Sequence, residues 1–217
     1  MKQFLVVGLG RFGTAVATEL SRLGHEVLAV DRHMDRVEAV ADIVTHAVCT
    51  DASQEDELSA LGVSNFDAAI VAIGGDLQAS ILITMLLKEM GVPFVLTKAQ
   101  SLLHAKILTK MGADKVIQPE SEMGIRVART LVSASVLDFI ELSPDFSLVE
   151  LGVPKMWQGK ALRELAIPAK YGVNIIAIRD ASGGISVTPK AGDVLEEGQV
   201  LVVIGANRDI EKIENLR

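Results

Sequence analysis

The sequence has little of what several common protein classes require. Its 217 residues include one cysteine, Cys49, so the chain can form neither an internal disulfide nor a cysteine metal cluster, which fits a reducing compartment. Its longest apolar runs, such as residues 68–73 and 81–87, are far shorter than the roughly 20 residues that span a bilayer. We therefore expect a cytoplasmic protein without a transmembrane segment.

Clusters of basic residues are also absent. The chain carries 21 Lys and Arg against 28 Asp and Glu, which leaves a formal net charge of -7. Nucleic-acid binding needs grouped Lys and Arg to contact phosphates, so no nucleic-acid partner is expected. Aromatic residues make up only 4% of the chain, so the core must consist of Val, Ile, Leu and Ala, as in buried parallel strands and their covering helices. This composition favours an α/β fold.

Short apolar runs alternate with helical patterns over the first half of the chain. Such alternation is typical of βαβ units around a parallel sheet. The predicted strands cover residues 4–8, 26–31, 45–49, 68–73, 94–98 and 115–118. The predicted helices cover residues 11–23, 34–41, 55–61, 77–90, 102–111 and 123–135. The sequence therefore predicts a doubly wound parallel sheet.

The alternation of strands and helices ends after the last of these helices. Short strands are predicted at residues 137–141, 148–151, 174–178, 185–187 and 200–204, and helical pieces at 159–166 and 208–216. This mixture indicates a small α+β domain. We therefore divide the chain into an α/β domain at residues 1–136, which includes the helix leading out of the sheet, and a small α+β C-terminal domain at residues 137–217.

The most informative motif follows the first predicted strand and opens the first helix. It matches G-x-G-x-x-G and reads Gly8-Leu9-Gly10-Arg11-Phe12-Gly13. In this context Gly8 permits a tight turn, Gly10 leaves room for a diphosphate, and Gly13 lets the helix approach the strand. The helix then presents unpaired N–H groups to the phosphates. The motif predicts a Rossmann-type nucleotide-binding domain.

Three charged residues near this motif bear on the ligand. Asp31 ends the second strand, 21 residues after Gly10, where its carboxylate can accept hydrogen bonds from both ribose hydroxyls. This favours an adenosine ligand without a 2'-phosphate, although the adjacent Arg32 could accommodate one. Arg11 opposes the dipole of its helix unless an anion lies nearby, so it is either a phosphate contact or a solvated surface residue.

The sequence shows no reaction centre. Tyr171, the only tyrosine, is followed four residues later by Ile175 rather than by the lysine of short-chain dehydrogenases. The four histidines have no metal-ligand spacing. We therefore assign no catalytic residue and expect a binding protein rather than an enzyme.

Nearly the whole chain resembles the cytoplasmic gating-ring subunits of Ktr-type potassium transporters, which regulate potassium conductance, and is similar also to Trk-type subunits. The motifs that carry the resemblance are VVGLGRFGTAVA, GHEVLAVD, CTDAS, NFDAAIVAIG, LQAS, TKAQS, KMGADKVIQPE and AKYGVNIIAI. The resemblance implies binding of ATP or ADP. It also implies a homodimer that assembles into an octameric ring on a membrane-embedded potassium transporter subunit, peripheral to the inner face of the cell membrane.

The resemblance also implies roles for individual residues. Asp31 would hold the ribose, the turn of Asp51 and Ala52 would lie near adenine, and Lys98 would approach the ribose and phosphates. Arg11 would reach the γ-phosphate across the dimer interface, where Glu120 would help to hold Mg2+ or Na+. The alternative for Glu120 is an ordinary acidic residue in the first turn of a helix.

In the second domain the resemblance implies a site for cyclic di-AMP at a dimer interface. Asn174, Ile175 and Ile176, with Pro189, stand where that ligand would be held. Pro168 departs from the pattern, because members that bind the ligand commonly carry an arginine in this stretch. Ile175 and its neighbours could also simply form a core strand.

Two other functions remain open from the sequence. The glycine motif and Asp31 would serve NAD(H) equally well in a small NAD-dependent oxidoreductase, because a Rossmann-type fold does not determine function. A purely structural dimerisation module would bind no nucleotide.

Overall fold

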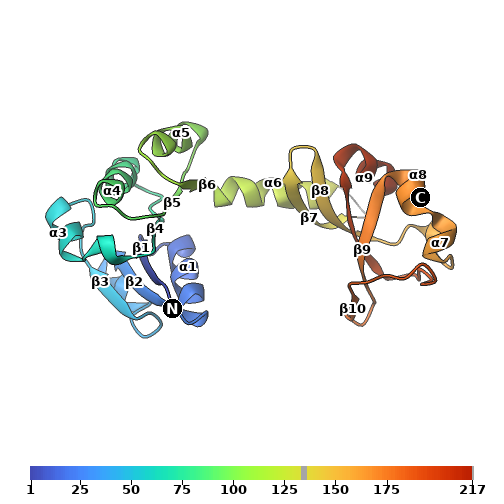
Figure 1. Cartoon of the computed structure of the whole chain (residues 1–217), viewed down its shortest axis with the longest axis horizontal. Coiled ribbons are helices and arrows are strands. Elements are labelled where there is room, and N and C mark those ends of the chain that lie inside the picture. The colour runs from blue at the N-terminus through green and yellow to red at the C-terminus, as the bar shows by residue number, and fades with distance from the viewer. Residues whose placement is uncertain (133–135, 217) are drawn as a thin grey trace. The chain divides into compact units, whose positions relative to one another are not determined.

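The computed structural model describes residues 1–132 and 136–216 and divides into two compact units, Met1–Pro119 and Glu120–Arg217. The first unit is built on a parallel sheet with strand order β3-β2-β1-β4-β5-β6, drawn in blue to green in Figure 1. Its strands are β1 (Gln3–Val7), β2 (Glu26–Asp31), β3 (His46–Cys49), β4 (Ala68–Val71), β5 (Val95–Lys98) and β6 (Lys115–Ile117). This is the strand order of the Rossmann fold, so the predicted fold class is confirmed.

Helices cover both faces of this sheet. They are α1 (Arg11–Arg22), α2 (Met34–Glu38), α3 (Glu55–Ala60), α4 (Leu77–Glu89) and α5 (Leu102–Lys110), with a short 3-10 helix, η1 (Val63–Asn65). Alternate side chains of the strands point to opposite faces. Accordingly, Val6 packs in one cluster with Ala17 of α1, whereas Leu5 packs in another with Ile83 of α4. The strands are thus buried on both sides, as their continuous apolar runs predict.

The order of the strands determines where a ligand can bind. The chain runs outward from β1 to β3 and then returns to place β4 on the other side of β1. In open α/β sheets such a reversal leaves a crevice at the carboxyl ends of the strands. The glycine loop lies at this edge, between β1 and α1.

The second unit contains an antiparallel sheet with strand order β10-β9-β11-β8-β7. Its strands are β7 (Val136–Ser143), β8 (Phe146–Gly152), β9 (Val173–Arg179), β10 (Ile185–Ser186) and β11 (Val200–Ala206). The helices are α6 (Pro119–Val132), η2 (Lys155–Trp157), α7 (Leu162–Leu165), α8 (Ile167–Tyr171) and α9 (Asn207–Glu214). A core around Val149, Trp157 and Leu201 joins sheet and helices, which confirms the α+β prediction.

The helix α6 differs from the prediction in its start and in the unit to which it belongs. It begins at Pro119 rather than at residue 123, and the predicted end at residues 133–135 lies outside the described residues. Arg126 forms two hydrogen bonds with Asp138 of β7, and the guanidinium of Arg129 lies 4.1 Å from the ring centre of Phe139. These contacts join α6 to the second unit, so the structure divides ahead of α6, whereas the sequence analysis placed the boundary behind it, at 136/137.

The stretch between β8 and β9 also differs from the prediction. In place of one helix at residues 159–166, two short helices follow one another, because Ala166 adopts a left-handed conformation with φ of 46° that ends α7. Pro168 then stands near the start of α8, where a proline costs no helical hydrogen bond. Helices of four and five residues are too short to be recognised by periodicity.

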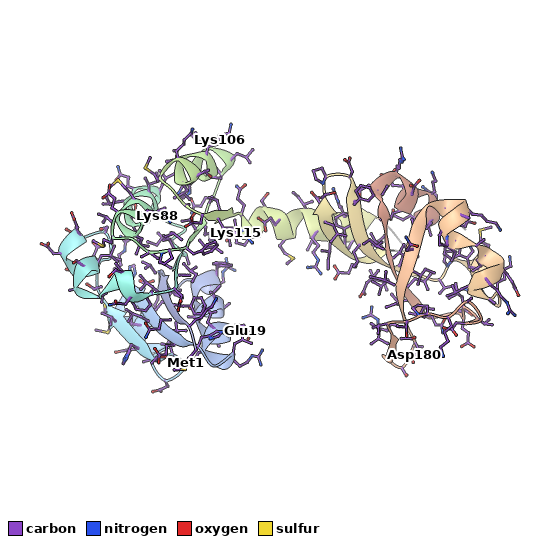
Figure 2. The ribbon with its side chains drawn as sticks, in the orientation of Figure 1. Met1, Glu19, Lys88, Lys106, Lys115 and Asp180 are labelled. Atoms are coloured by element: carbon purple, nitrogen blue, oxygen red, sulfur yellow. The ribbon has the colours of Figure 1, made fainter. Side chains whose placement is uncertain are left out.

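The predicted turn at residues 182–184 is present. Asp180, labelled in Figure 2, accepts hydrogen bonds from the backbone N–H and the hydroxyl of Ser182 and from the N–H of Gly184.

Within the described ranges, no helix is both long and apolar enough to cross a membrane.

Candidate nucleotide-binding site

The three glycines of the motif have different structural tasks. Gly8 has a φ of 95°, a left-handed conformation that favours glycine, and its N–H donates to the carbonyl of Val30 at 2.8 Å. A Cβ on Gly13 would lie 1.8 Å from the carbonyl oxygen of Gly8, so only glycine fits there. A Cβ on Gly10 would meet no atom within 4 Å. Two glycines therefore serve the fold, and the third borders open space.

The amino terminus of α1 has features that favour a bound anion. Its N-cap, Gly10, offers no side-chain cap, and the first turn contains no acidic residue. The first-turn N–H groups of a helix carry a partial positive charge, which favours a phosphate. Arg11 is exposed in this first turn, whereas Phe12 is half-buried and packs against the core. Of these two side chains, only that of Arg11 is exposed.

Asp31 is the most constrained residue of the site. It is 5% exposed, and its Oδ2 accepts a hydrogen bond of 2.7 Å from the N–H of Leu9 in the glycine loop. Its Oδ1 accepts from the N–H of His33 at 2.9 Å, and the guanidinium of Arg36 lies 3.3 Å from Oδ2. Burial would raise the pKa of Asp31, but these hydrogen bonds and the charge of Arg36 outweigh it and lower the pKa below its usual value. The carboxylate is therefore ionised and fixed in place.

A pocket opens at the carboxyl ends of β1, β2 and β4. Its empty space is ≈ 470 Å³, including the part open to solvent. The pocket brings together five of the predicted residues, Gly8, Asp31, Arg32, Asp51 and Ala52. It also includes lining residues that the sequence analysis missed, namely Val7, Thr50, Ile73, Gly75, Asp76, Ala79 and Ile83. Val7 ends β1 and Thr50 follows β3. The other five follow β4, the neighbour of β1, and this position was the signal that could have indicated them.

The far wall of the pocket is the turn after β3. The carboxylate of Asp51 accepts hydrogen bonds from the N–H and the hydroxyl of Ser53, at 3.0 and 2.7 Å. The hydrogen bonds from Ser53 hold the pKa of Asp51 below its usual value, and the charge of Arg32 contributes. Ala52 is buried beside it. The turn is therefore held by hydrogen bonds and by the burial of Ala52.

Lys98 and Glu120 lie outside the lining of the pocket. Lys98 ends β5, and its Nζ lies 3.5 Å from the position that a Cβ on Gly74 would take, so its ammonium borders the loop between β4 and α4. Glu120 stands exposed in the first turn of α6 and belongs to the second unit. In the described part of the chain, no group of three or more His, Cys, Asp or Glu side chains could hold a metal ion.

The residues predicted for cyclic di-AMP are arranged around β9. The pairing of β9 with β11 shifts at Ile176, which is left without a partner in the register, as in a β-bulge. Asn174 and Ile176 are exposed, whereas Ile175 packs against the core. Pro189 is half-buried and follows β10, the neighbour of β9 in the sheet. The side chains available to a ligand on β9 are therefore those of Asn174 and Ile176.

Fold and site together define a class of two-domain proteins, in which a Rossmann-type sheet with a glycine-rich loop is followed by a small antiparallel α+β domain. Comparison with known proteins agrees. Residues 4–119 match the TrkA-N domain and residues 146–217 match the TrkA-C domain. The chain is 46% identical to Ktr system potassium uptake protein A of Bacillus subtilis, over 99% of this chain and 96% of that protein.

Two further comparisons point the same way. Ktr system potassium uptake protein C of Bacillus subtilis is also 46% identical, over 98% of this chain and 96% of that protein. The GsuK channel structure has the same fold, with a TM-score of 0.70 at 19% identity, over 99% of this chain and 39% of that one. The chain belongs to the family of Ktr system potassium uptake proteins, which confirms the resemblance inferred from the sequence motifs.

The different tasks of the glycines lead to a prediction. We expect Gly13→Ala to lower the free energy of unfolding of the first unit by about 3 kcal/mol or more, because its Cβ would collide with a backbone oxygen. Gly10→Ala should change stability by less than about 1 kcal/mol but weaken nucleotide binding about tenfold, because the methyl group occupies the open space. Thermal unfolding and titration calorimetry measure both effects. Unfolding of Gly13→Ala at the wild-type temperature would contradict the packing argument.

Proposed function

We propose that this chain is a regulatory subunit that senses ATP and ADP and gates a membrane-embedded potassium transporter. The observation that carries the proposal is the pocket at the carboxyl ends of β1, β2 and β4, with the buried, ionised Asp31 on its wall, in a chain of a potassium uptake family. The subunit would act from the cytoplasm, at the inner face of the membrane, through its partner. This function needs no catalysis.

The charges of the site orient a nucleotide in one direction. Asp31 and Asp51 lie at the pocket, where hydroxyl and amino groups of adenosine can donate to them. Arg11 and the uncapped amino terminus of α1 lie on the glycine-loop side, where phosphates are favoured. The phosphate chain would therefore follow the glycine loop, past Gly10, with Lys98 bordering the loop after β4.

The ribose would compete with protein donors for Asp31. A carboxylate offers about four lone-pair sites, and Leu9, His33 and Arg36 already use them. The contact with Arg36, at 3.3 Å, is the longest, and 47% of the Arg36 side chain is exposed. We expect a ribose hydroxyl to replace Arg36 while the bond from Leu9 persists.

The difference between ATP and ADP would arise at the γ-phosphate. We propose that Arg11 of one protomer reaches the γ-phosphate bound by its dimer partner, and that Glu120 helps to hold Mg2+ or Na+ beside it. Charge-assisted contacts of guanidinium and metal with a terminal phosphate are strong, and ADP lacks them. A difference of about 1–3 kcal/mol between two ring states is typical of allosteric coupling.

An oligomer would cover apolar surface on the helices. Leu102 and Leu103 of α5 are 74% and 69% exposed, and Leu131 of α6 is 80% exposed. Contiguous exposed apolar patches are typical of subunit interfaces. We propose the homodimer and the octameric ring as the assembly that buries them.

A second ligand, cyclic di-AMP, is proposed for the C-terminal domain. Support comes from Asn174 and Ile176, which are exposed on β9 beside the bulge at Ile176, because bulges are common next to binding sites. Two copies of the domain would hold the ligand between their β9 strands, with Pro189 nearby.

The alternative function, a small NAD-dependent oxidoreductase, is not favoured, because the relatives are potassium uptake proteins. NAD(H) is still an alternative ligand for the pocket in the first unit.

The γ-phosphate assignment predicts a selective loss. We expect Arg11→Ala and Glu120→Gln each to weaken ATP binding in the presence of Mg2+ about tenfold and ADP binding less than about twofold, because only ATP makes the contacts. Titration calorimetry with ATP and ADP, with and without Mg2+, measures this. Arg22→Ala, at the other end of α1, is the matched control. An equal loss of ATP and ADP binding would refute the assignment.

The departure at Pro168 predicts a gain of binding. We expect Pro168→Arg to strengthen cyclic di-AMP binding about tenfold, because the new guanidinium can pair with a phosphate of the ligand. Pro168 is exposed at the start of α8, where other residues also fit. Asn174→Ala in the same background should remove the gain. If Pro168→Arg binds no better than wild type in calorimetry, the proposed ligand position is wrong.

A further inference from the structure

An ion pair spans the pocket from one side to the other. The Nη1 atom of Arg32 lies 3.4 Å from the Oδ2 atom of Asp76. Arg32 follows β2, Asp76 precedes α4 after β4, and both residues line the pocket. Since β2 and β4 flank β1 in the sheet, the pair crosses the carboxyl end of β1, above the floor formed by Val7 and Gly8. Neither the sequence motifs nor the proposed function includes Asp76.

Asp76 is held in position independently of Arg32. It is the N-cap of α4, and its Oδ1 accepts a hydrogen bond of 3.0 Å from the N–H of Ala79. This cap fixes the side chain and leaves Oδ2 directed at the guanidinium. On the opposite wall, Asp51 is anchored by Ser53, and Arg32 contributes to the electrostatic environment of its carboxylate. Arg32 is therefore attracted by two carboxylates that cannot easily move away.

The charge balance of the pocket disfavours a second phosphate at the ribose. Among the described lining residues, Asp31, Asp51 and Asp76 carry carboxylates and Arg32 carries the guanidinium. A 2'-phosphate adds about -1.5 to -2 charges near neutral pH. An arginine beside the ribose acid is the residue that normally accommodates such a phosphate. Here that arginine, Arg32, is already paired with Asp76.

We propose that Asp76 is a specificity-determining residue: by holding Arg32, it makes the pocket accept adenine nucleotides with a free 2'-hydroxyl and reject those with a 2'-phosphate. This inference deepens the proposed function and rests on it only in that an adenine nucleotide occupies this pocket. Asp31 disfavours a 2'-phosphate, whereas an unpaired Arg32 would accommodate one. Because Asp76 holds Arg32, the pocket as a whole excludes the 2'-phosphate.

The test compares ligands that differ in the 2'-phosphate. NADH and NADPH form one pair, and ADP and adenosine 2',5'-bisphosphate form another. Calorimetry on the full chain gives the affinity ratio within each pair for wild type, Asp76→Asn, and Asp76→Asn combined with Arg32→Ala. Asparagine is as good an N-cap as aspartate, so α4 keeps its cap while the charge is removed. Asp42→Asn, which removes an exposed carboxylate ahead of β3, is the charge-matched control.

We expect wild type to favour the ligand without the 2'-phosphate, and Asp76→Asn to reduce that preference by releasing Arg32. The reduction should be about threefold, because the side chains of the ion pair are 56% and 36% exposed. The double variant should restore the wild-type preference, and Asp42→Asn should leave the ratios unchanged. An unchanged ratio in Asp76→Asn, or a reduced one in the double variant, would overturn the role of Asp76 while leaving the nucleotide site intact. If wild type binds none of the four ligands, both the inference and the proposed function fail.

Discussion

One buried hydrogen bond connects the parts of this nucleotide site. The N–H of Leu9 donates to Asp31 at 2.7 Å and so ties the glycine loop after β1 to the end of β2. The bond orients the carboxylate toward the pocket and, with His33 and Arg36, keeps it ionised despite its burial. It also positions the turn at Gly8, and therefore the start of α1. The geometry of the phosphate side and of the ribose side depends on this one contact.

The two ends of the proposed nucleotide site differ in charge, and in the proposed function this difference connects binding to regulation. The adenosine end is rich in carboxylates, whereas the glycine-loop end has Arg11 and an uncapped helix amino terminus. In the proposed site ATP and ADP would share the adenosine end and differ only at the last phosphate. A ligand can shift an equilibrium between two assemblies only by its difference in affinity for them. In our account the first domain supplies binding, and the subunit interfaces supply the difference between ATP and ADP.

Much of the first unit was predictable from the sequence because local and long-range signals agree there. Short apolar runs that alternate with helical patterns mark the strands, and the motif from Gly8 to Gly13 identifies the loop in which the structure requires Gly8 and Gly13. Asp76 was not found, because an aspartate before a helix reads as an ordinary N-cap, and its partner Arg32 is 44 residues away. The helix α8 was missed since five residues carry no periodic pattern. The pairing of α6 with β7 depends on contacts between side chains, which spacing does not reveal.

The most direct test of the central claim is a calorimetric titration of ADP into the full chain and into Asp31→Asn. The account predicts saturable binding to wild type and an affinity at least about tenfold lower in the variant, because a charged hydrogen-bond acceptor for the ribose is lost. Thermal unfolding of both proteins shows whether the fold is kept, since asparagine can still accept the bond from Leu9. Equal affinity in the two folded proteins, or no binding to wild type, would contradict the account.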